Sequence, residues 1–578
     1  MILEGAGVLL VALILTSWFA GWPGGVGANG TSLVALAVLG AARATLARPS
    51  SAAVVGALRP LPETAACLGV AVLYRLPALL HPWGFVNKDG AFGAFIAIHL
   101  LAGLRPAPVF TEGATYQGSL KGQLSALLAL LTGSRDFAFL MLVTSVLLYL
   151  AFLVASMALV RRLSGRWGAA ATGLYLALGP KFLTTFSLNC VGQYMDVLAL
   201  GGMALTLVGS LLDADRHGAE ARFRYLAVGL LLGAAFWQQP VALAYLGTAA
   251  TALALRPRGS RRDPWTLAAV LGFVIGALPV LLFNLANDWA SSGLLGRDRA
   301  ELRAQAEVLP SLVARTVRVA FPILAGLSPG HPWSGVPGLR FLAAALVPLV
   351  LLGYLWTKRR ALTGGARGGR SAAALPVLLS LWTAALFWAT AAGRINERPR
   401  YLLPLLAAAA LELGVVLGAV QRRSSLAAAA LAVPIVALNV AGTLPRLGES
   451  AAIEAYWRGV VRSLDEKGIR SGYSDFGIAA PVTMFTAERI TLSARLGPTP
   501  AYYSELQERR VARAEQNAFI LPKGDDPRAF AELLRVLGVR YRMVREPVVV
   551  FWELSRKVEL WELAGFRAQG RLVPGEDE

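Results

Sequence analysis

The chain contains a long series of apolar segments, each close to the length of a membrane-crossing helix. A helix of about 20 residues spans the hydrocarbon core of a bilayer, and apolar runs of that size recur along most of the 578 residues. The composition is 56% hydrophobic and only 16% charged, with a mean hydropathy of +0.56. A soluble core does not bury that much apolar side chain, so lipid must cover the excess. The pattern indicates a polytopic integral membrane protein and excludes one large soluble enzyme.

The formal net charge of +20 is typical of a nucleic-acid-binding protein only if the basic residues share one face. Here they form clusters in short loops between apolar runs. Such clusters mark cytoplasmic loops by the positive-inside rule, so we expect no nucleic-acid partner. The clusters are Arg161, Arg162 and Arg166; Arg216, Arg222 and Arg224; Arg256, Arg258, Arg261 and Arg262; Lys358, Arg359, Arg360, Arg367 and Arg370; Arg422 and Arg423.

We expect a mainly helical transmembrane bundle with about thirteen crossings, since an odd number places every basic cluster on the cytoplasmic side. The N-terminus is then cytoplasmic and the C-terminus extracytoplasmic, in the inner membrane of a bacterium. Glu4 stands where a signal peptide carries basic residues, so the first apolar run is interpreted as a retained anchor. The expected crossings are Gly5–Gly21, Thr31–Ala47, Glu63–Leu80, Phe137–Leu163, Gly168–Pro180, Tyr194–Leu212, Tyr225–Trp237, Val241–Leu255, Trp265–Asn284, Leu339–Trp356, Ala372–Ala392, Tyr401–Val420 and Ser425–Thr443.

Two domains follow from this pattern. Residues 1–444 form the transmembrane domain, with a long outer loop at residues 81–136. Within that loop, Ala91–Leu104 and Ser119–Leu131 are apolar on one face and too short to span, which is typical of helices lying in the interface. Residues 445–578 have mixed charge and short alternating segments, and predict a small extracytoplasmic α/β domain.

The first candidate for chemistry is Asp89, an isolated carboxylate just outside the third crossing. A carboxylate at the membrane surface can deprotonate or orient a hydroxyl acceptor next to a lipid-linked substrate. The structural alternative is a cap for the helix that begins near Ala91.

The second candidate is the group Arg394, Arg398 and Arg400, which lies on the outer side against the positive-inside trend. Outward arginines need an anionic partner, and a phosphate matches the bidentate geometry of guanidinium. The alternative is anchoring to lipid headgroups, with Tyr401 in the aromatic belt at the membrane surface.

These residues carry a family resemblance. Asp89, the Tyr116-Gln-Gly-Ser-Leu120 stretch and Arg400-Tyr-Leu-Leu-Pro404 resemble polyprenyl-phosphate-sugar-dependent glycosyltransferases of the GT-C superfamily. Within it, the chain resembles bacterial relatives of protein O-mannosyltransferase and of the lipid A aminoarabinose transferase. The layout of residues 63–443 resembles theirs, and Gly472-Tyr-Ser-Asp-Phe-Gly477 is similar to part of the outer domain of some bacterial members.

The resemblance implies that Asp89 activates or positions the acceptor and that Arg400 lies near the donor phosphate. The chain departs from the family pattern in two places. Lys88-Asp89 stands where many members have two acidic residues, and Gly118-Ser119 where they have two prolines. A divalent metal is compatible with the loop but is not indicated, because only Asp89 and Glu112 supply carboxylate oxygens there.

Weaker candidates line the predicted outer ends of other helices. Lys181 contacts a phosphate or extends to headgroups, and Gln193 and Asp196 line a substrate cavity or, for Asp196, cap a helix. Glu112, Tyr116 and Tyr401 complete the predicted cavity. We expect the amides of Trp237-Gln-Gln-Pro240 to satisfy backbone groups freed at a helix break, and Glu412 to face a cavity or bond to a neighbouring helix.

The sequence therefore predicts an inverting transfer of a sugar from a polyprenyl-phosphate donor to a hydroxyl on an unidentified glycan, lipid or protein. Arg400, with Arg398 or Lys181, holds the phosphate, and Asp89 serves the acceptor. The alternative is a transporter or lipid flippase, although paired broken helices from inverted repeats are not visible. A third alternative, a scaffold that presents the C-terminal domain, gives no reason for the outward arginines.

Overall fold

The structure is a computed structural model, and it describes most of the chain beyond residue 61. The predicted crossings Gly5–Gly21 and Thr31–Ala47 and the residue Arg398 lie outside the described residues. Those that are described are 62–104, 108–112, 114–189, 192–212, 219–255, 265–291, 308–363, 372–390, 399–496 and 505–563.

The described residues fold into two compact units. Unit 1 holds the residues up to Leu76, those of Ser145–Ser187 and those of Gln193–Arg446. Unit 2 holds Pro77–Thr144, Leu188–Gly192 and the residues from Leu447 onward. The predicted boundary at residues 444/445 falls close to the passage between units at Arg446, and the predicted outer loop belongs to the same unit as the C-terminal segment.

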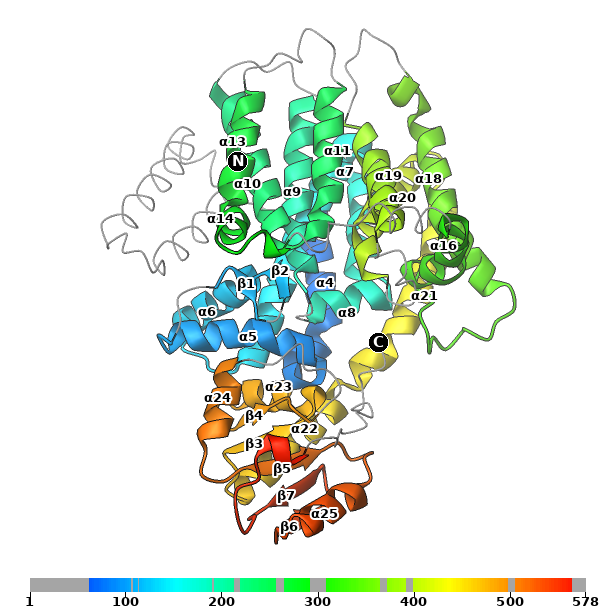
Figure 1. Ribbon diagram of the computed structural model, residues 1–578. Coiled ribbons are helices and arrows are strands. Elements are labelled where there is room, and N and C mark those ends of the chain that lie inside the picture. The colour runs from blue at the N-terminus through cyan, green and yellow to red at the C-terminus, as the bar shows by residue number, and fades with distance from the viewer. Residues whose placement is uncertain are drawn as a thin grey trace. The chain divides into compact units, whose positions relative to one another are not determined.

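Unit 1 is helical, with α9, α10 and α11 running side by side (Figure 1). Helices α4 (Pro62–Leu80) and α7 (Phe137–Ala177) contribute to both units. The other elements of unit 1 are α8 (Lys181–Leu188), α9 (Tyr194–Leu212), α10 (Ala219–Gln238), η2 (Pro240–Ala242), α11 (Leu243–Ala254), α13 (Thr266–Gly276), α14 (Leu278–Ala286), α16 (Leu309–Arg315), the π-helical turn η4 (Thr316–Ala320), α17 (Phe321–Leu324), α18 (Leu339–Thr363), α19 (Ala374–Ala389), η6 (Arg400–Leu402), α20 (Leu403–Gln421) and α21 (Ser425–Gly448).

Six helices in the described part of the chain are long and apolar enough to cross a membrane. The bent pair α13 and α14, which meet at 57°, makes a seventh if it is one span. The protein is therefore an integral membrane protein, but the predicted number of thirteen crossings is not confirmed. The predicted crossings Phe137–Leu163 and Gly168–Pro180 correspond to the two parts of α7, which are separated by a kink at Gly165, where φ is 79°. Only glycine adopts such a φ at little cost, so the break lies where the sequence allows it.

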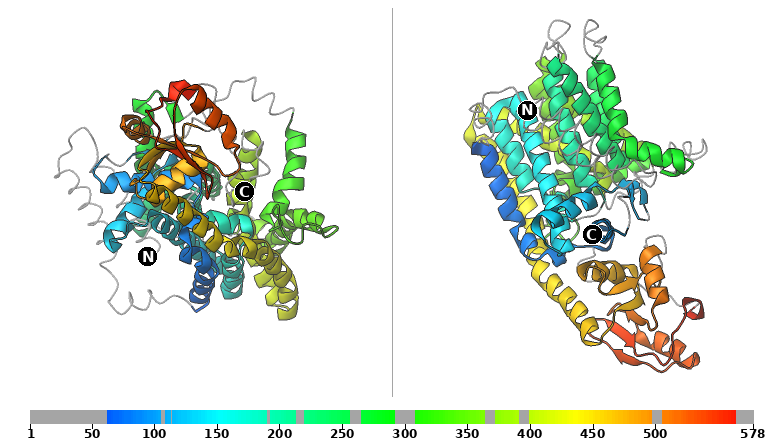
Figure 2. Two further views of the ribbon diagram at one scale, coloured as in Figure 1. Left: turned by 90° about the horizontal axis from the view of Figure 1, so that it is seen from below. Right: turned by 90° about the vertical axis from the view of Figure 1, so that its left-hand side faces the viewer.

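Unit 2 contains the short helices of residues 81–136, the predicted outer loop, and a five-stranded sheet. Its elements are η1 (Pro82–Phe85), α5 (Lys88–Leu101), β1 (Phe110–Thr111), β2 (Ala114–Gly118), α6 (Leu120–Thr132), α22 (Ser450–Glu466), β3 (Ser471–Ser474), α23 (Phe476–Phe485), β4 (Thr491–Ser493), α24 (Glu505–Arg513), β5 (Ala518–Leu521), α25 (Pro527–Val536), β6 (Arg542–Val544), β7 (Val549–Trp552) and η8 (Leu560–Leu563). Figure 2 shows this sheet, in orange to red, from two further directions.

The sheet has the strand order β4-β3-β5-β7-β6, with β3 parallel to both of its neighbours and β7 antiparallel to its own. Alternate residues of a strand face opposite sides, so each side has its own core. Phe519 and Leu521 of β5 pack with residues of α24 and α25, whereas Ala518 and Ile520 face the opposite core.

That opposite core joins the C-terminal segment to the first outer loop. It contains residues of α22 and α23 from the C-terminal segment together with residues of α5 and α6. The predicted interfacial helices Ala91–Leu104 and Ser119–Leu131 correspond to α5 and α6. The helix that carries Asp89 is thus built into the unit that contains the sheet.

Candidate functional site

Asp89 lies in the first turn of α5 and is half-buried. It does not cap the helix, because that position belongs to Asn87, whose side chain accepts a hydrogen bond from the Gly90 amide over 2.8 Å. The alternative prediction, that Asp89 is the N-cap of this helix, is therefore wrong.

The residue before Asp89 faces the C-terminal segment. The Lys88 ammonium lies 5.9 Å from the centre of the Phe476 ring, next to the buried Asp475 that caps α23. Burial raises the pKa of Asp475, against the opposing effects of the Gly477 amide hydrogen bond and the Lys88 charge. Phe476 and Asp475, both in the Gly472–Gly477 motif, thus lie near Lys88.

Glu112 and Tyr116 lie on the short hairpin of β1 and β2, where both are half-buried. The sequence reasoning missed Lys121, one position beyond the Tyr116–Leu120 stretch. Its side chain is fully buried, and the ammonium donates a hydrogen bond to the Gly192 carbonyl over 3.0 Å. A lysine inside an apolar helix was the available signal, because burial of such a charge requires partners.

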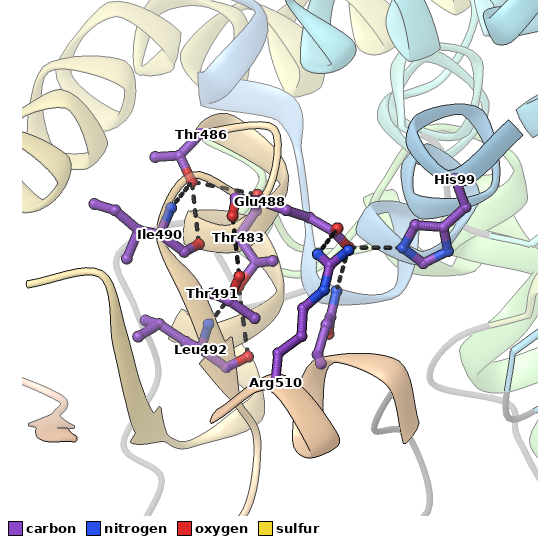
Figure 3. Close-up of polar contacts among 9 residues, drawn as sticks. His99, Thr483, Thr486, Glu488, Ile490, Thr491, Leu492 and Arg510 are labelled. Carbon is purple, nitrogen blue, oxygen red and sulfur yellow. Dashed lines mark hydrogen bonds and ion pairs between the residues drawn. The ribbon is translucent and has the colours of Figure 1, made fainter. Parts of the chain in front are cut away.

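A second missed feature is a buried polar network in unit 2 (Figure 3). His99, near the end of α5, donates through Nε2 to Glu488 Oε1 over 2.7 Å. Arg510 of α24 pairs with the other carboxylate oxygen, and Gln507 lies 3.5 Å from Oε1. The His99 and Glu488 side chains are each 5% exposed. The network ties the Asp89 helix to two segments of the C-terminal part.

Glu488 is held in a tight turn between α23 and β4. Its φ is +64°, a conformation that costs free energy for a residue with a side chain. Its amide donates to the Thr483 carbonyl over 2.8 Å, and Thr486 Oγ1 accepts from the Ile490 amide over 3.1 Å. Burial alone would raise the pKa of Glu488, but the hydrogen bond from His99 and the charge of Arg510 hold that pKa below its usual value.

We expect Glu488→Gln to lower the free energy of unfolding by about 1–3 kcal/mol at pH 7, because hydrogen bonds to a buried charge are lost. The lowered pKa of Glu488 means that its ionised form stabilises the fold above its unfolded value of about 4.5, and that this contribution is lost as the pH falls below it. The difference between variant and wild type should therefore shrink toward pH 4. Thermal unfolding of purified protein at several pH values measures this.

The matched control is Glu505→Gln, which removes an exposed carboxylate paired with Arg509 on the same helix as Arg510. Exposed pairs contribute little, so this control should change stability by less than about 1 kcal/mol. Equal losses in both variants, or a Glu488→Gln deficit that is the same at pH 4 and pH 7, would contradict the assignment.

In unit 1, a chain of aromatic rings joins three of the elements that carry predicted site residues. Phe182 and Phe186 of α8 lie 5.0 Å apart, ring centre to ring centre. Phe186 meets Tyr194, the first residue of α9, edge to face at 5.2 Å, and Tyr194 meets Tyr401 of η6 at 6.2 Å. Aromatic pairs at such spacings stabilise the contact beyond their buried area.

The two predicted phosphate ligands of unit 1 stand at the ends of this chain of rings. Lys181 is the first residue of α8 and Arg400 the first of η6, and both are half-buried. The Arg400 guanidinium carbon lies 5.4 Å from the centre of the Tyr401 ring. Both cations are thus carried by elements that the aromatic rings connect through Tyr194, the first residue of α9.

Arg75 is a third cation beside α8, and the sequence reasoning missed it. It is fully buried; Nε donates to Ser187 Oγ over 2.8 Å, and Nη1 to the carbonyls of Ala177 and Ala71 over 3.0 and 3.1 Å. Its guanidinium also lies 4.1 Å from the centre of the Tyr149 ring. No carboxylate among the described residues pairs with it. Arg75 therefore holds the end of α7 to α8, and an arginine inside an apolar crossing was the signal.

Gln193 and Asp196 lie at the start of α9 and are buried. Asp196 already interacts within the protein, whereas Gln193 Oε1 has no hydrogen-bond partner among the described residues. Gln238 also has a partner. The prediction that the amides of this turn satisfy freed backbone groups is wrong for Gln239, since neither of its amide atoms has a partner in the described part of the chain.

Glu412 behaves as predicted. It is 1% exposed in α20 and accepts a hydrogen bond from Ser380 Oγ of α19 over 3.0 Å. Its role in joining two helices accounts for a carboxylate within an apolar segment.

No group of three or more histidine, cysteine, aspartate or glutamate side chains arranged to hold a metal ion occurs among the described residues. Asp89 and Glu112, the carboxylates considered as metal ligands, therefore belong to no such group in the described part of unit 2.

Comparison with solved structures decides the fold. ArnT from Cupriavidus metallidurans in the apo state matches with a TM-score of 0.54 at 16% identity, and the match covers 84% of this chain and 98% of ArnT. ArnT bound to undecaprenyl phosphate matches with a TM-score of 0.55 at 15% identity over the same shares. The chain has the GT-C fold. The resemblance stated from the sequence is confirmed at the level of the fold.

The Archaeoglobus fulgidus oligosaccharyltransferase in complex with zinc and sulfate is also similar, with a TM-score of 0.48 at 12% identity over 86% of this chain and 73% of that one. No protein-family model and no curated protein sequence matches the chain. The likeness to GT-C proteins therefore lies in the arrangement of helices.

Proposed function

We propose that this protein is a membrane glycosyltransferase that moves a sugar from a polyprenyl-phosphate donor to a hydroxyl acceptor on the outer face of the membrane. The observation that carries the proposal is the GT-C fold shared with ArnT. Lys181 and Arg400, on elements that contact the start of α9 through aromatic rings, support it. The ArnT structure with undecaprenyl phosphate supports a lipid-linked donor of the same class.

On the donor side, Arg400 binds the phosphate with Lys181, and Arg398 completes the set. A guanidinium suits this role because it donates two parallel hydrogen bonds to phosphate oxygens. As the bond between the sugar and the phosphate breaks, the phosphate gains negative charge, so these cations stabilise the transition state more than the bound donor.

On the acceptor side, Asp89 orients the hydroxyl and accepts its proton. The hydroxyl oxygen forms a bond to the anomeric carbon as the bond from that carbon to the phosphate oxygen breaks, which releases polyprenyl phosphate. A single displacement of this kind inverts the anomeric configuration. The acceptor is a glycan, a lipid or a protein of the cell envelope.

The alternative of a transporter or flippase is not favoured by the GT-C fold. The buried carboxyl group of Glu412, which would fit a transport pathway, accepts a hydrogen bond from Ser380 and so has a structural role between two helices.

The test is a transfer assay in proteoliposomes with undecaprenyl phosphate that carries a radiolabelled monosaccharide, and an envelope extract as the acceptor source. We expect label to enter acceptor material covalently and undecaprenyl phosphate to be released in equal amount. Movement of the labelled lipid between leaflets without covalent transfer would support the flippase instead.

A further inference from the structure

Three uncharged polar side chains in unit 1 are buried without hydrogen-bond partners among the described residues. Both amide atoms of Gln239, the Oε1 atom of Gln193 and the hydroxyl of Tyr245 are in this state. The three residues are 1%, 3% and 1% exposed. A buried polar group without a partner is destabilising, and such groups in proteins are usually completed by a ligand or by ordered water.

Gln193 and Gln239 belong to one end of two neighbouring helices, α9 and α10. Helices α9 and α10 pack against each other, and only residues 213–218 connect them, so the start of α9 lies at the same end as the end of α10 (Figure 1). Gln193 directly precedes α9 and Gln239 directly follows α10, and η2 also contacts α9. Tyr245 lies in the first turn of α11, with its ring so close to Gly201 of α9 that a Cβ there would lie 2.5 Å from Tyr245 Cγ. Gly201 follows Gln193 by eight residues, or about 12 Å of helix, so the Tyr245 hydroxyl is treated apart from the two glutamines.

The chemistry of the group selects its ligand. Each amide offers both a donor and an acceptor, and a phenol hydroxyl offers the same. None of the three is a cation, so the group is not built for a phosphate, and its polarity does not suit an isoprenoid chain. Hydroxyl groups, which also donate and accept, complement it. Asp196, the nearest carboxylate in sequence, is already engaged within the protein.

We propose that Gln239, together with Gln193, binds hydroxyl groups of the sugar that is transferred and so determines which sugar is accepted. This inference rests on the proposed function. It adds to that function a residue that selects the sugar. Buried groups of this kind discriminate strongly, because a sugar that lacks the matching hydroxyl leaves them unpaired.

The experiment compares Gln239→Leu with wild type in binding two probes, undecaprenyl phosphate and undecaprenyl-phosphate-glucose. Leucine preserves the approximate volume and removes both amide contacts. We expect the sugar-bearing lipid to bind the variant about 10-fold more weakly, the loss typical of hydrogen bonds in a buried site, and the sugarless lipid to bind unchanged. The control is Gln421→Leu, which removes an amide that bonds to Ser425 on the exposed surface.

Donors that each lack one sugar hydroxyl provide a second arm, whose first measurement uses wild type alone. At least one deoxy donor should bind wild type about 10-fold more weakly than its parent, and Gln239→Leu should bind both equally, as expected for a direct contact. If Gln239→Leu does not fold, Gln193→Leu takes its place in the same comparison.

The outcomes separate the hypotheses. Equal weakening of sugar-bearing and sugarless lipid would overturn the sugar subsite and place Gln239 in the support of the phosphate site. Unchanged binding of both lipids would mean that water alone completes the amide. Failure of wild type to bind either lipid would overturn the proposed function itself and this inference with it.

Discussion

Asp89→Asn should lower sugar transfer by roughly 100-fold or more while leaving the protein folded and donor binding unchanged. Asparagine has the size of aspartate but does not accept a proton. The N-cap of α5 is Asn87, so the substitution does not remove the cap. Turnover in proteoliposomes and the affinity for undecaprenyl phosphate, measured on the same preparation, check both parts of the expectation.

Asp136→Asn is the matched control for this variant. Asp136 belongs to the same unit and is exposed, and its carboxylate accepts from the Phe139 amide over 3.0 Å at the start of α7. Asparagine makes the same cap, so activity should remain. Near-normal transfer by Asp89→Asn at normal expression would remove Asp89 from the catalytic machinery.

Arg400→Ala should weaken the binding of undecaprenyl phosphate by about 10- to 100-fold, the loss expected for charge-assisted hydrogen bonds. Transfer should slow further at saturating donor, because the charge on the leaving phosphate grows in the transition state. The two variants thus fail differently: Asp89→Asn binds donor normally, and Arg400→Ala does not. Arg400→Lys keeps the charge without the bidentate geometry, and should recover part of the binding.

The control for Arg400 is Arg423→Ala, which removes an exposed cation beyond the other end of α20. It should leave donor affinity within about 2-fold of wild type, since exposed charges far from the ligand are screened. A similar loss of affinity in both variants would indicate a general effect of charge on lipid binding. In that case Arg400 would be a headgroup anchor, as the alternative from the sequence holds.

Much of the local structure followed from the sequence because the signals are local. The apolar run that predicts Tyr194–Leu212 corresponds to α9, and the predicted interfacial helix Ser119–Leu131 corresponds to α6. Run length and side-chain period decide such elements without reference to the rest of the chain. The break in α7 at Gly165 falls between the predicted crossings Phe137–Leu163 and Gly168–Pro180, since the basic cluster at residues 161–166 already separates the two apolar runs.

The candidate site divides in the same way. The sequence by itself identified Asp89, Arg400 and Lys181 as chemically distinct residues, since charge at the edge of an apolar segment is visible in one dimension. It did not find Arg75 as a buried link or His99 as the partner of Glu488, because each depends on residues about 100 or more positions away.

What the sequence determined, therefore, is the membrane class, most of the helices and the residue types available for chemistry. Tertiary structure alone decided that the C-terminal segment shares a core with α5 and α6, and that four aromatic rings gather α8, α9 and η6. It also left Gln239 buried without a partner in the described part of the chain. The reason is physical: hydrophobicity and helix period act over a few residues, whereas burial and pairing depend on which distant segments pack together.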